Sequence, residues 1–244
     1  MSDLEDVLEL MHTSTGRWAS LRMDGFEWRH LKTFHLAWEH HVTELRRRRS
    51  VTVISAVRFE RVEGGEPPEE SLERWRVWLA KPDKRRAQFQ VGDEVVAAVF
   101  FGDWWWGWSP SRGFMTNDGA PNHSHGFGPA EGLIDHSGQI ASLDLRVDGR
   151  STFLSRPVFR VTVVPRLDEH DVFDRTLHML GTGADEYRLV VDGEIGVLLR
   201  CEARYGGNAF RVIEADEVGV DEVFSQGTFE PELLRAGLPD ASQQ

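Results

Sequence analysis

The sequence is poor in the features that mark a disulfide-bonded, secreted or membrane-spanning protein. It has one cysteine, Cys201, among 244 residues, so no disulfide can form within the chain. No uninterrupted apolar run approaches the roughly 20 residues of a membrane span. The opening residues, MSDLEDVLEL, lack the basic region and apolar run of a secretory signal. A chain that starts at Met1 is therefore expected in the cytoplasm, and a start further upstream would permit a place in the cell envelope.

Positive charge is also scarce. The chain carries 28 Lys and Arg against 40 Asp and Glu, a formal net charge of -12. Binding to phosphate backbones requires a basic face, which this balance argues against. The one basic run, Arg46 to Arg49, follows a helical pattern, and cations are favoured at a helix C-terminus. We interpret it as a solvated helix end and expect no nucleic-acid partner.

Catalytic and metal signatures are missing as well. The sequence has no Gly-x-Ser-x-Gly elbow, no phosphate-binding glycine loop and no HExxH motif. His123 and His125 could supply two metal ligands and a histidine of residues 33–46 a third, but solvated loop histidines are the favoured interpretation. We expect no catalytic residues, no metal and no cofactor.

Alternation of apolar and polar residues is what the chain has in abundance, above all in its closing third. Cys201 and Ala203 share one parity with Val197 and Leu199, whereas the charged residues between them take the other. This period of two predicts an antiparallel strand with one dry and one wet face. Cys201 is then a buried small apolar residue rather than a nucleophile.

The same patterns predict one domain over residues 1–244. A bulge at Gly25 is expected to switch the faces of the first strand, and tight turns are expected at Gly92-Asp93 and Gly102-Asp103. Residues 110–128 read as a long surface loop, and 169–180 as a loop or helical insertion. Helices are expected over 2–13, 33–46 and 129–136, and strands over 17–31, 51–62, 74–80, 86–91, 94–101, 140–147, 157–164, 187–192, 196–204 and 209–216.

Three stretches carry a resemblance to a known family. They are RWRVWLAKPDKRRAQFQV, FFGDWWWGWSP and RPVFRVTVVPR, and the paired strands of the closing third follow them. In order and spacing they resemble the LolA-like superfamily of lipoprotein carriers and related regulators, over most of residues 72–229. The resemblance implies an α+β fold, a curved, unclosed antiparallel half-barrel whose helices cover the concave face. It also implies an apolar cavity that binds acyl chains.

Nine tryptophans bear on that cavity. They either fill the core or line a wide apolar pocket. Phe100, Trp104 and Trp106 share one parity if their strand runs through Gly102. The candidate cavity residues are Trp18, Trp28, Trp75, Phe100, Trp104 and Trp106. The sequence thus predicts a non-enzymatic protein that binds a lipid-like or acyl-like small molecule. A regulatory module for a protein partner and an enzyme that uses the same cavity are the alternatives.

Overall fold

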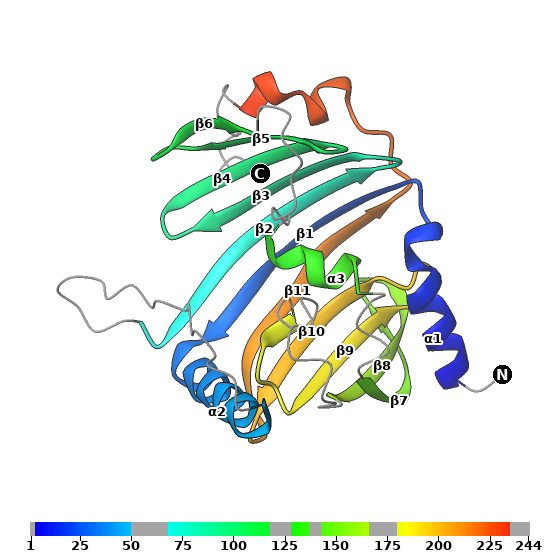
Figure 1. Cartoon of the computed structure of the whole chain (residues 1–244). Coiled ribbons are helices and arrows are strands. Elements are labelled where there is room, and N and C mark those ends of the chain that lie inside the picture. The colour runs from blue at the N-terminus through cyan, green and yellow to red at the C-terminus, as the bar shows by residue number, and fades with distance from the viewer. Residues whose placement is uncertain (1–2, 50–67, 118–127, 137–142, 166–179, 235–244) are drawn as a thin grey trace. The chain divides into compact units, whose positions relative to one another are not determined.

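The chain forms one eleven-stranded sheet with a few helices (Figure 1). This computed structural model describes residues 3–49, 68–117, 128–136, 143–165 and 180–234. The strand order is β6-β5-β4-β3-β2-β1-β11-β10-β9-β8-β7, so β6 and β7 are end strands and the sheet does not close. The unclosed antiparallel α+β fold predicted from the sequence is confirmed.

Most predicted elements are present with shifted ends. The helices are α1 (Asp3–Thr13), α2 (Leu31–Arg49) and α3 (Glu131–Ile134), and the 3-10 turns are η1 (Ser14–Gly16), η2 (Gly128–Ala130), η4 (Gln226–Phe229) and η5 (Pro231–Leu234). The strands are β1 (Ser20–His30), β2 (Glu70–Ala80), β3 (Lys84–Val91), β4 (Glu94–Phe101), β5 (Trp104–Ser109), β6 (Gly113–Thr116), β7 (Leu143–Phe153), β8 (Arg156–Pro165), β9 (Glu186–Asp192), β10 (Leu198–Tyr205) and β11 (Asn208–Val220). The predicted strand 51–62 and insertion 169–180 lie outside the described residues, apart from Leu180.

The chain divides into two compact units. Unit 1 comprises Met1–Thr15, Glu27–Leu72 and Gly132–Glu214, and unit 2 comprises Gly16–Phe26, Glu73–Glu131 and Ala215–Gln244. Three strands, β1, β2 and β11, contribute residues to both units. The organisation as a single domain stays a prediction.

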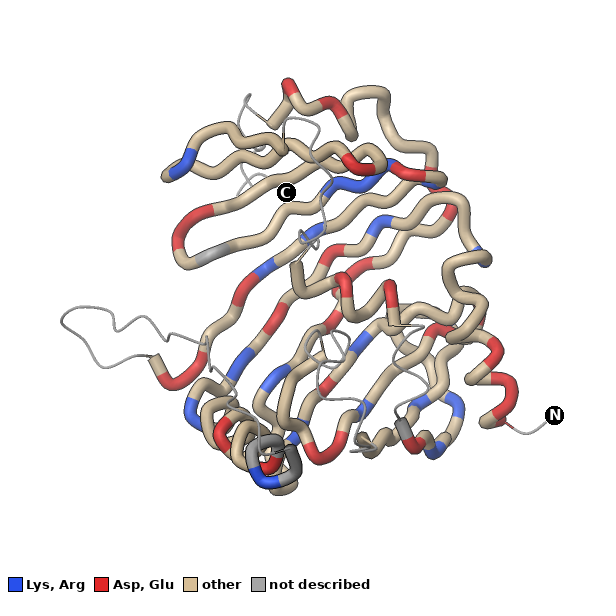
Figure 2. Tube along the Cα trace, in the orientation of Figure 1, with Lys and Arg blue, Asp and Glu red and all other residues tan. Residues whose placement is uncertain are grey.

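Unit 1 has the dry and wet faces expected from its alternating sequence. Val161, Leu189, Cys201 and Ile213 are successive cross-strand partners, and all four are buried. Burial raises the pKa of the Cys201 thiol to about 12, so it is an inert core residue. The register places Arg200, Glu202 and Glu214 on the opposite face. Figure 2 shows Lys or Arg and Asp or Glu positions along these strands. The ion pairs of this face include Arg200–Glu214, Arg200–Glu202 and Arg204–Glu202.

The first strand departs from the prediction at Gly25. Burial alternates without interruption along β1, and Leu21, Met23, Gly25 and Glu27 are all buried. The predicted bulge is therefore wrong, and Glu27 rather than Trp28 shares the parity of Leu21. The side chain of Glu27 is fully buried and accepts hydrogen bonds from Arg211 Nε at 2.5 Å and Arg29 Nε at 2.6 Å. These cations allow the carboxylate to be buried.

Unit 2 buries both faces of its part of the sheet. Trp75, Val77 and Leu79 of β2 are buried on one face. Ala97 and Val99 of β4 are buried in an apolar cluster on the other. The turns at Gly92 and Gly102 form as predicted, each with glycine at positive φ. The predicted loop 110–128 is corrected in part, because its residues 113–116 form β6 beside β5.

Candidate ligand pocket

The turn at Gly102-Asp103 decides which aromatic side chains share a face in unit 2. Phe101 is the cross-strand partner of Trp104, and Val99 that of Trp106. Cross-strand partners point to the same side of a sheet. The turn thus resets the parity, and Phe101 replaces Phe100 on the face of the β5 tryptophans. We call Trp78, Phe101, Trp106 and Trp108, together with Ala97 and Val99 between them, the aromatic face.

The aromatic face is covered by the residues that follow β11, which we call the C-terminal segment (Asp221–Leu234). It begins at Asp221, a non-glycine residue at φ 56°, whose Oδ1 accepts a hydrogen bond from Ala19 N at 2.6 Å. Ser20 Oγ then donates to Glu222 O at 2.7 Å. Further along, Phe229 and Leu234 are buried against Ala97 and Val99. The segment therefore leaves the sheet at a fixed point and returns its apolar side chains to it.

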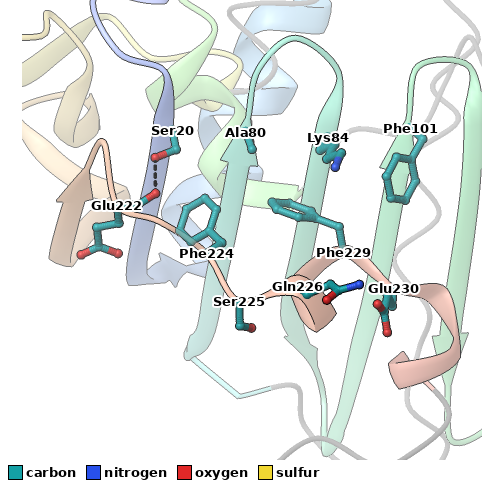
Figure 3. A pocket seen from close by; sticks show the side chains of 10 residues that line it. All are labelled: Ser20, Ala80, Lys84, Phe101, Glu222, Phe224, Ser225, Gln226, Phe229 and Glu230. Atoms are coloured by element: carbon teal, nitrogen blue, oxygen red, sulfur yellow. Dashed lines mark hydrogen bonds between the residues drawn. The ribbon is translucent and has the colours of Figure 1, made fainter.

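A pocket of about 450 Å³ lies between the C-terminal segment and the strand ends. Phe224 and Phe229 point from the segment toward β2, β3 and β4, where Phe101 faces them (Figure 3). The rings of Phe224 and Phe229 meet edge to face, with centroids 5.7 Å apart. The full lining is Ser20, Ala80, Lys84, Phe101, Glu222, Phe224, Ser225, Gln226, Phe229 and Glu230. The pocket thus combines an apolar wall of three phenylalanine rings and Ala80 with a polar side that includes one cation, Lys84, and the carboxylates of Glu222 and Glu230.

Basic side chains stand beside this apolar surface. The Nζ atom of Lys84 lies 5.9 Å from the ring centroid of Phe101. The guanidinium groups of Arg76 and Arg86 lie 5.5 and 5.2 Å from the ring of Trp78. Burial, followed by the charge of Arg76, lowers the pKa of Arg86. Arg86 Nη1 donates to Thr228 O at 2.9 Å, which ties the segment to β3.

The six predicted cavity residues are divided between the two units. Five lie in unit 2, whereas Trp28 lies in unit 1 and donates from Nε1 to Glu70 Oε2 at 3.0 Å. Trp104 and Trp106 stack with ring centroids 6.2 Å apart, and Trp104 is 49% exposed. None of the six is among the ten lining residues of the pocket, so their role in ligand binding stays a prediction.

Three of the six are buried in unit 2 by protein contacts. The Trp18 ring lies under Lys81, whose Nζ is 4.0 Å from its centroid. Trp75 is paired across the sheet with Phe89, and Phe100 with Trp105 on the side opposite Trp106. Phe101, Phe224, Phe229 and Lys84 line the pocket but are not among the residues predicted from the sequence. The signal for Phe101 was available, because a two-residue hairpin turn pairs the residues that flank it.

Other kinds of site find no support in the described part of the chain. No group of three or more His, Cys, Asp or Glu is placed there to hold a metal ion. His35, His40 and His41 lie on α2, and His123 and His125 lie outside the described residues. Among the helices searched, none combines the length and apolar character needed to cross a membrane.

Comparison with known proteins gives a likeness of fold. No protein-family model and no curated protein matches the chain. MucB has 13% identity and a TM-score of 0.52, over 94% of this chain and 63% of that one. MucB in the Pseudomonas aeruginosa MucA/MucB complex has 13% identity and a TM-score of 0.51, over 94% and 61%. A LolA superfamily protein from Nitrosomonas europaea has 10% identity and a TM-score of 0.35, over 96% and 100%.

The chain therefore spans less than two thirds of the MucB chains that it matches. At 13% identity the likeness shows the fold alone. The likeness to MucB agrees with the unclosed sheet that the sequence resemblance implies, and it extends no further than the fold.

Proposed function

We propose that this protein is a non-enzymatic binding protein that holds an apolar, acyl-like ligand in the pocket under the C-terminal segment. The observation that carries the proposal is the meeting of Phe101, Phe224 and Phe229 around about 450 Å³ of space. Ligand pockets usually measure about 300–1,000 Å³ and are mostly apolar. Lys84, at the same pocket, offers a positive charge for a carboxylate head group.

The expected affinity follows from the size of the pocket. Each CH₂ group removed from water contributes about 0.8 kcal/mol, so eight such groups would contribute about 6 kcal/mol. Association costs offset part of this gain. Without these costs, 6 kcal/mol would correspond to a dissociation constant of about 40 µM, so a medium-length fatty acid should bind with a dissociation constant between roughly 100 µM and a few millimolar. Trp106, whose ring centroid lies 5.9 Å from that of Phe101, can report on binding through its fluorescence.

The test is a titration with a brominated decanoic acid, whose bromine atoms quench nearby indoles. We expect saturable quenching that Phe224→Ala weakens at least about fivefold, because part of the apolar wall is removed. Val223→Ala is the matched control, since Val223 lies in the same segment and is 100% exposed. Lys84→Met should weaken the binding of the acid but leave the binding of decanol unchanged. Absence of saturable quenching, or equal binding by Phe224→Ala and wild type, would exclude this pocket as the ligand site.

A protein-binding function is the second candidate, and a specific observation favours it. The aromatic face already holds a stretch of polypeptide, the C-terminal segment, through buried Phe and Leu side chains. The MucB fold, solved in complex with MucA, also supports this candidate. A regulatory module of this kind would use the same face without any catalytic group.

A further inference from the structure

The C-terminal segment is held on the aromatic face in the way a bound peptide would be. Three apolar side chains, Phe224, Phe229 and Leu234, recur at intervals of five residues and pack on the strands. Phe229 is 7% exposed and Leu234 is 1% exposed. The backbone of the segment forms its own turns, with bonds from Thr228 N to Ser225 O and from Leu233 N to Glu230 O. Apolar anchors rather than strand pairing therefore seat the segment on the sheet.

The charges of the two surfaces are complementary. Lys84 and Arg86 lie on or beside the aromatic face, and the segment carries the exposed carboxylates Glu230 and Glu232. Arg76, which also lies beside Trp78, is already paired with Asp24 at 2.6 Å. Lys84 and Glu230 line the same pocket. Complementary charges of this kind favour encounter and select among partners. The face is thus suited to an acidic polypeptide with aromatic and aliphatic anchors.

The segment leaves one buried hydrogen-bond donor beside the aromatic face, Arg86 Nε, without an acceptor. Arg86 uses Nη1 to bond Thr228 O, but its Nε is buried and has no hydrogen-bond partner in the described part of the chain. A buried donor without an acceptor costs about 1–3 kcal/mol. A different polypeptide that supplies a carboxylate or carbonyl at this point would make the bond that the segment does not. The resident segment is therefore an incomplete match to its site.

The attachment of the segment would allow it to leave. Asp221 and Glu222 are fixed to the start of β1 by the hydrogen bonds from Ala19 N and Ser20 Oγ. The next residue, Val223, is 100% exposed and adds no packing. Rotation about Val223 would release residues 224–234 without breaking a bond of β11. The pivot thus separates the strand from the part of the segment that covers the face.

We propose that the aromatic face is a docking site for a partner protein segment that is acidic and carries Phe and Leu anchors, and that residues 224–234 occupy it within the same chain until the partner displaces them. This inference rests on the second candidate function. It makes the partner segment and the acyl-like ligand mutually exclusive, because displacement of residues 224–234 removes Phe224 and Phe229 from the wall of the acyl-ligand pocket. The tethered segment competes at an effective concentration of the order of millimolar, which lowers the apparent affinity of any partner.

The test adds a fluorescein-labelled peptide with the sequence of residues 222–234, EVFSQGTFEPELL, to the full chain and follows its anisotropy. The wild type should bind weakly. The charge-reversal variant Glu230→Lys/Glu232→Lys loosens the tethered segment by repulsion from Lys84 and Arg86, and it should bind the peptide at least about tenfold more tightly. Both glutamates are exposed, so this variant keeps the core intact. Phe229→Ala/Leu234→Ala provides a second loosened chain, with its fold checked by circular dichroism.

Two controls make the result decisive. A peptide with Ser in place of both Phe residues and the final Leu should not bind either loosened chain. Arg86→Gln, added to the charge-reversal variant, should lower the affinity of that variant for the peptide. Equal weak binding by wild type and both loosened chains, or equal binding of the Ser peptide, would overturn the docking site. Quenching by brominated decanoic acid is read in the wild type, whose pocket lining is intact, so a failed peptide with retained quenching leaves the acyl-ligand function standing.

Discussion

At the scale of single residues, His136 should make stability depend on pH. It is 1% exposed, and its Nδ1 lies 3.1 Å from Leu133 O. Burial lowers the pKa of His136 to about 4, from an ordinary value of 6.5. Between about pH 6.5 and pH 4, His136 is protonated in the unfolded chain but remains neutral in the folded chain. The folded state therefore loses stability as the pH falls from about 6.5 to about 4, by at most about 3 kcal/mol.

The measurement is urea unfolding at pH 7.5 and pH 4.5. Other groups also titrate in this range, so the comparison is between wild type and His136→Asn, which removes the titrating group. The wild type should lose about 2 kcal/mol more than the variant between the two pH values. An identical loss in both proteins would show that folding does not lower the pKa of His136.

Residues also show what the sequence could and could not predict. The burial of Cys201 was predicted correctly, because the alternation of apolar and polar residues in its own strand indicates it. Glu27 was not, because its burial depends on Arg211, which lies 184 residues away in the chain. A local pattern assigns a carboxylate to the wet face, and only the distant cation reverses that assignment.

At the scale of elements, two glycines set how closely helices α1 and α2 pack within unit 1. A side chain at Gly183 would collide with Ala37 O of α2, and one at Gly196 with Leu10 O of α1. Gly183 also has φ +88°, a conformation that other residues adopt with strain. These glycines are therefore required where the helices dock.

Gly183→Ala should displace α2 and destabilise the protein by about 2–3 kcal/mol, from overpacking and backbone strain together. Gly92→Ala is the matched control. Gly92 has φ +59° but nothing within 4 Å of its missing side chain, so only strain of about 1 kcal/mol applies. Hydrogen exchange of α2 amides should rise in the Gly183 variant alone. Equal destabilisation by the two substitutions would show that α2 does not depend on this contact.

Elements differed in how far the sequence predicted them. The hairpin strands β3 and β4 followed from alternation and the Gly92-Asp93 turn. Strand β6 was missed because its four residues, GFMT, stand in a stretch rich in glycine, proline and asparagine. The regular structure of the C-terminal segment is limited to two four-residue 3-10 turns, which are too short to show a period. Its role in the pocket depends on packing against β4, which the local sequence does not encode.

At the scale of the whole molecule, strand order is what the sequence left open. Pairing of β1 with β11 joins segments about 190 residues apart, and no local pattern specifies it. The resemblance to LolA-like proteins predicted the unclosed sheet through the order of its elements. It could not predict the site, because the pocket depends on which face Phe101 takes and on where the C-terminal segment returns.

The net charge, in contrast, follows directly from the sequence. The structure adds which of the basic side chains are already paired. The chain carries -12, and several arginines of the sheet are already paired with carboxylates. Arg22 bonds Glu217 at 2.5 Å, Arg74 bonds Asp216 at 2.7 Å, and Arg76 bonds Asp24 at 2.6 Å. Affinity for nucleic acid arises from cations that replace the counterions of several successive phosphates. Arginines that are already paired with neighbouring carboxylates are poorly able to replace the counterions of phosphates.

We therefore expect no binding of a 20-nucleotide single strand or a 20-base-pair duplex, of DNA or RNA, up to about 10 µM protein at physiological salt, where even non-specific binders show dissociation constants of about 10⁻⁴–10⁻⁶ M. Fluorescence anisotropy checks this, with a basic DNA-binding protein as the positive control. Arg47→Glu should change nothing, because Arg47 is paired with Glu44 at 2.9 Å. Sub-micromolar binding that weakens steeply with added salt would contradict the prediction, since that dependence is the signature of released counterions.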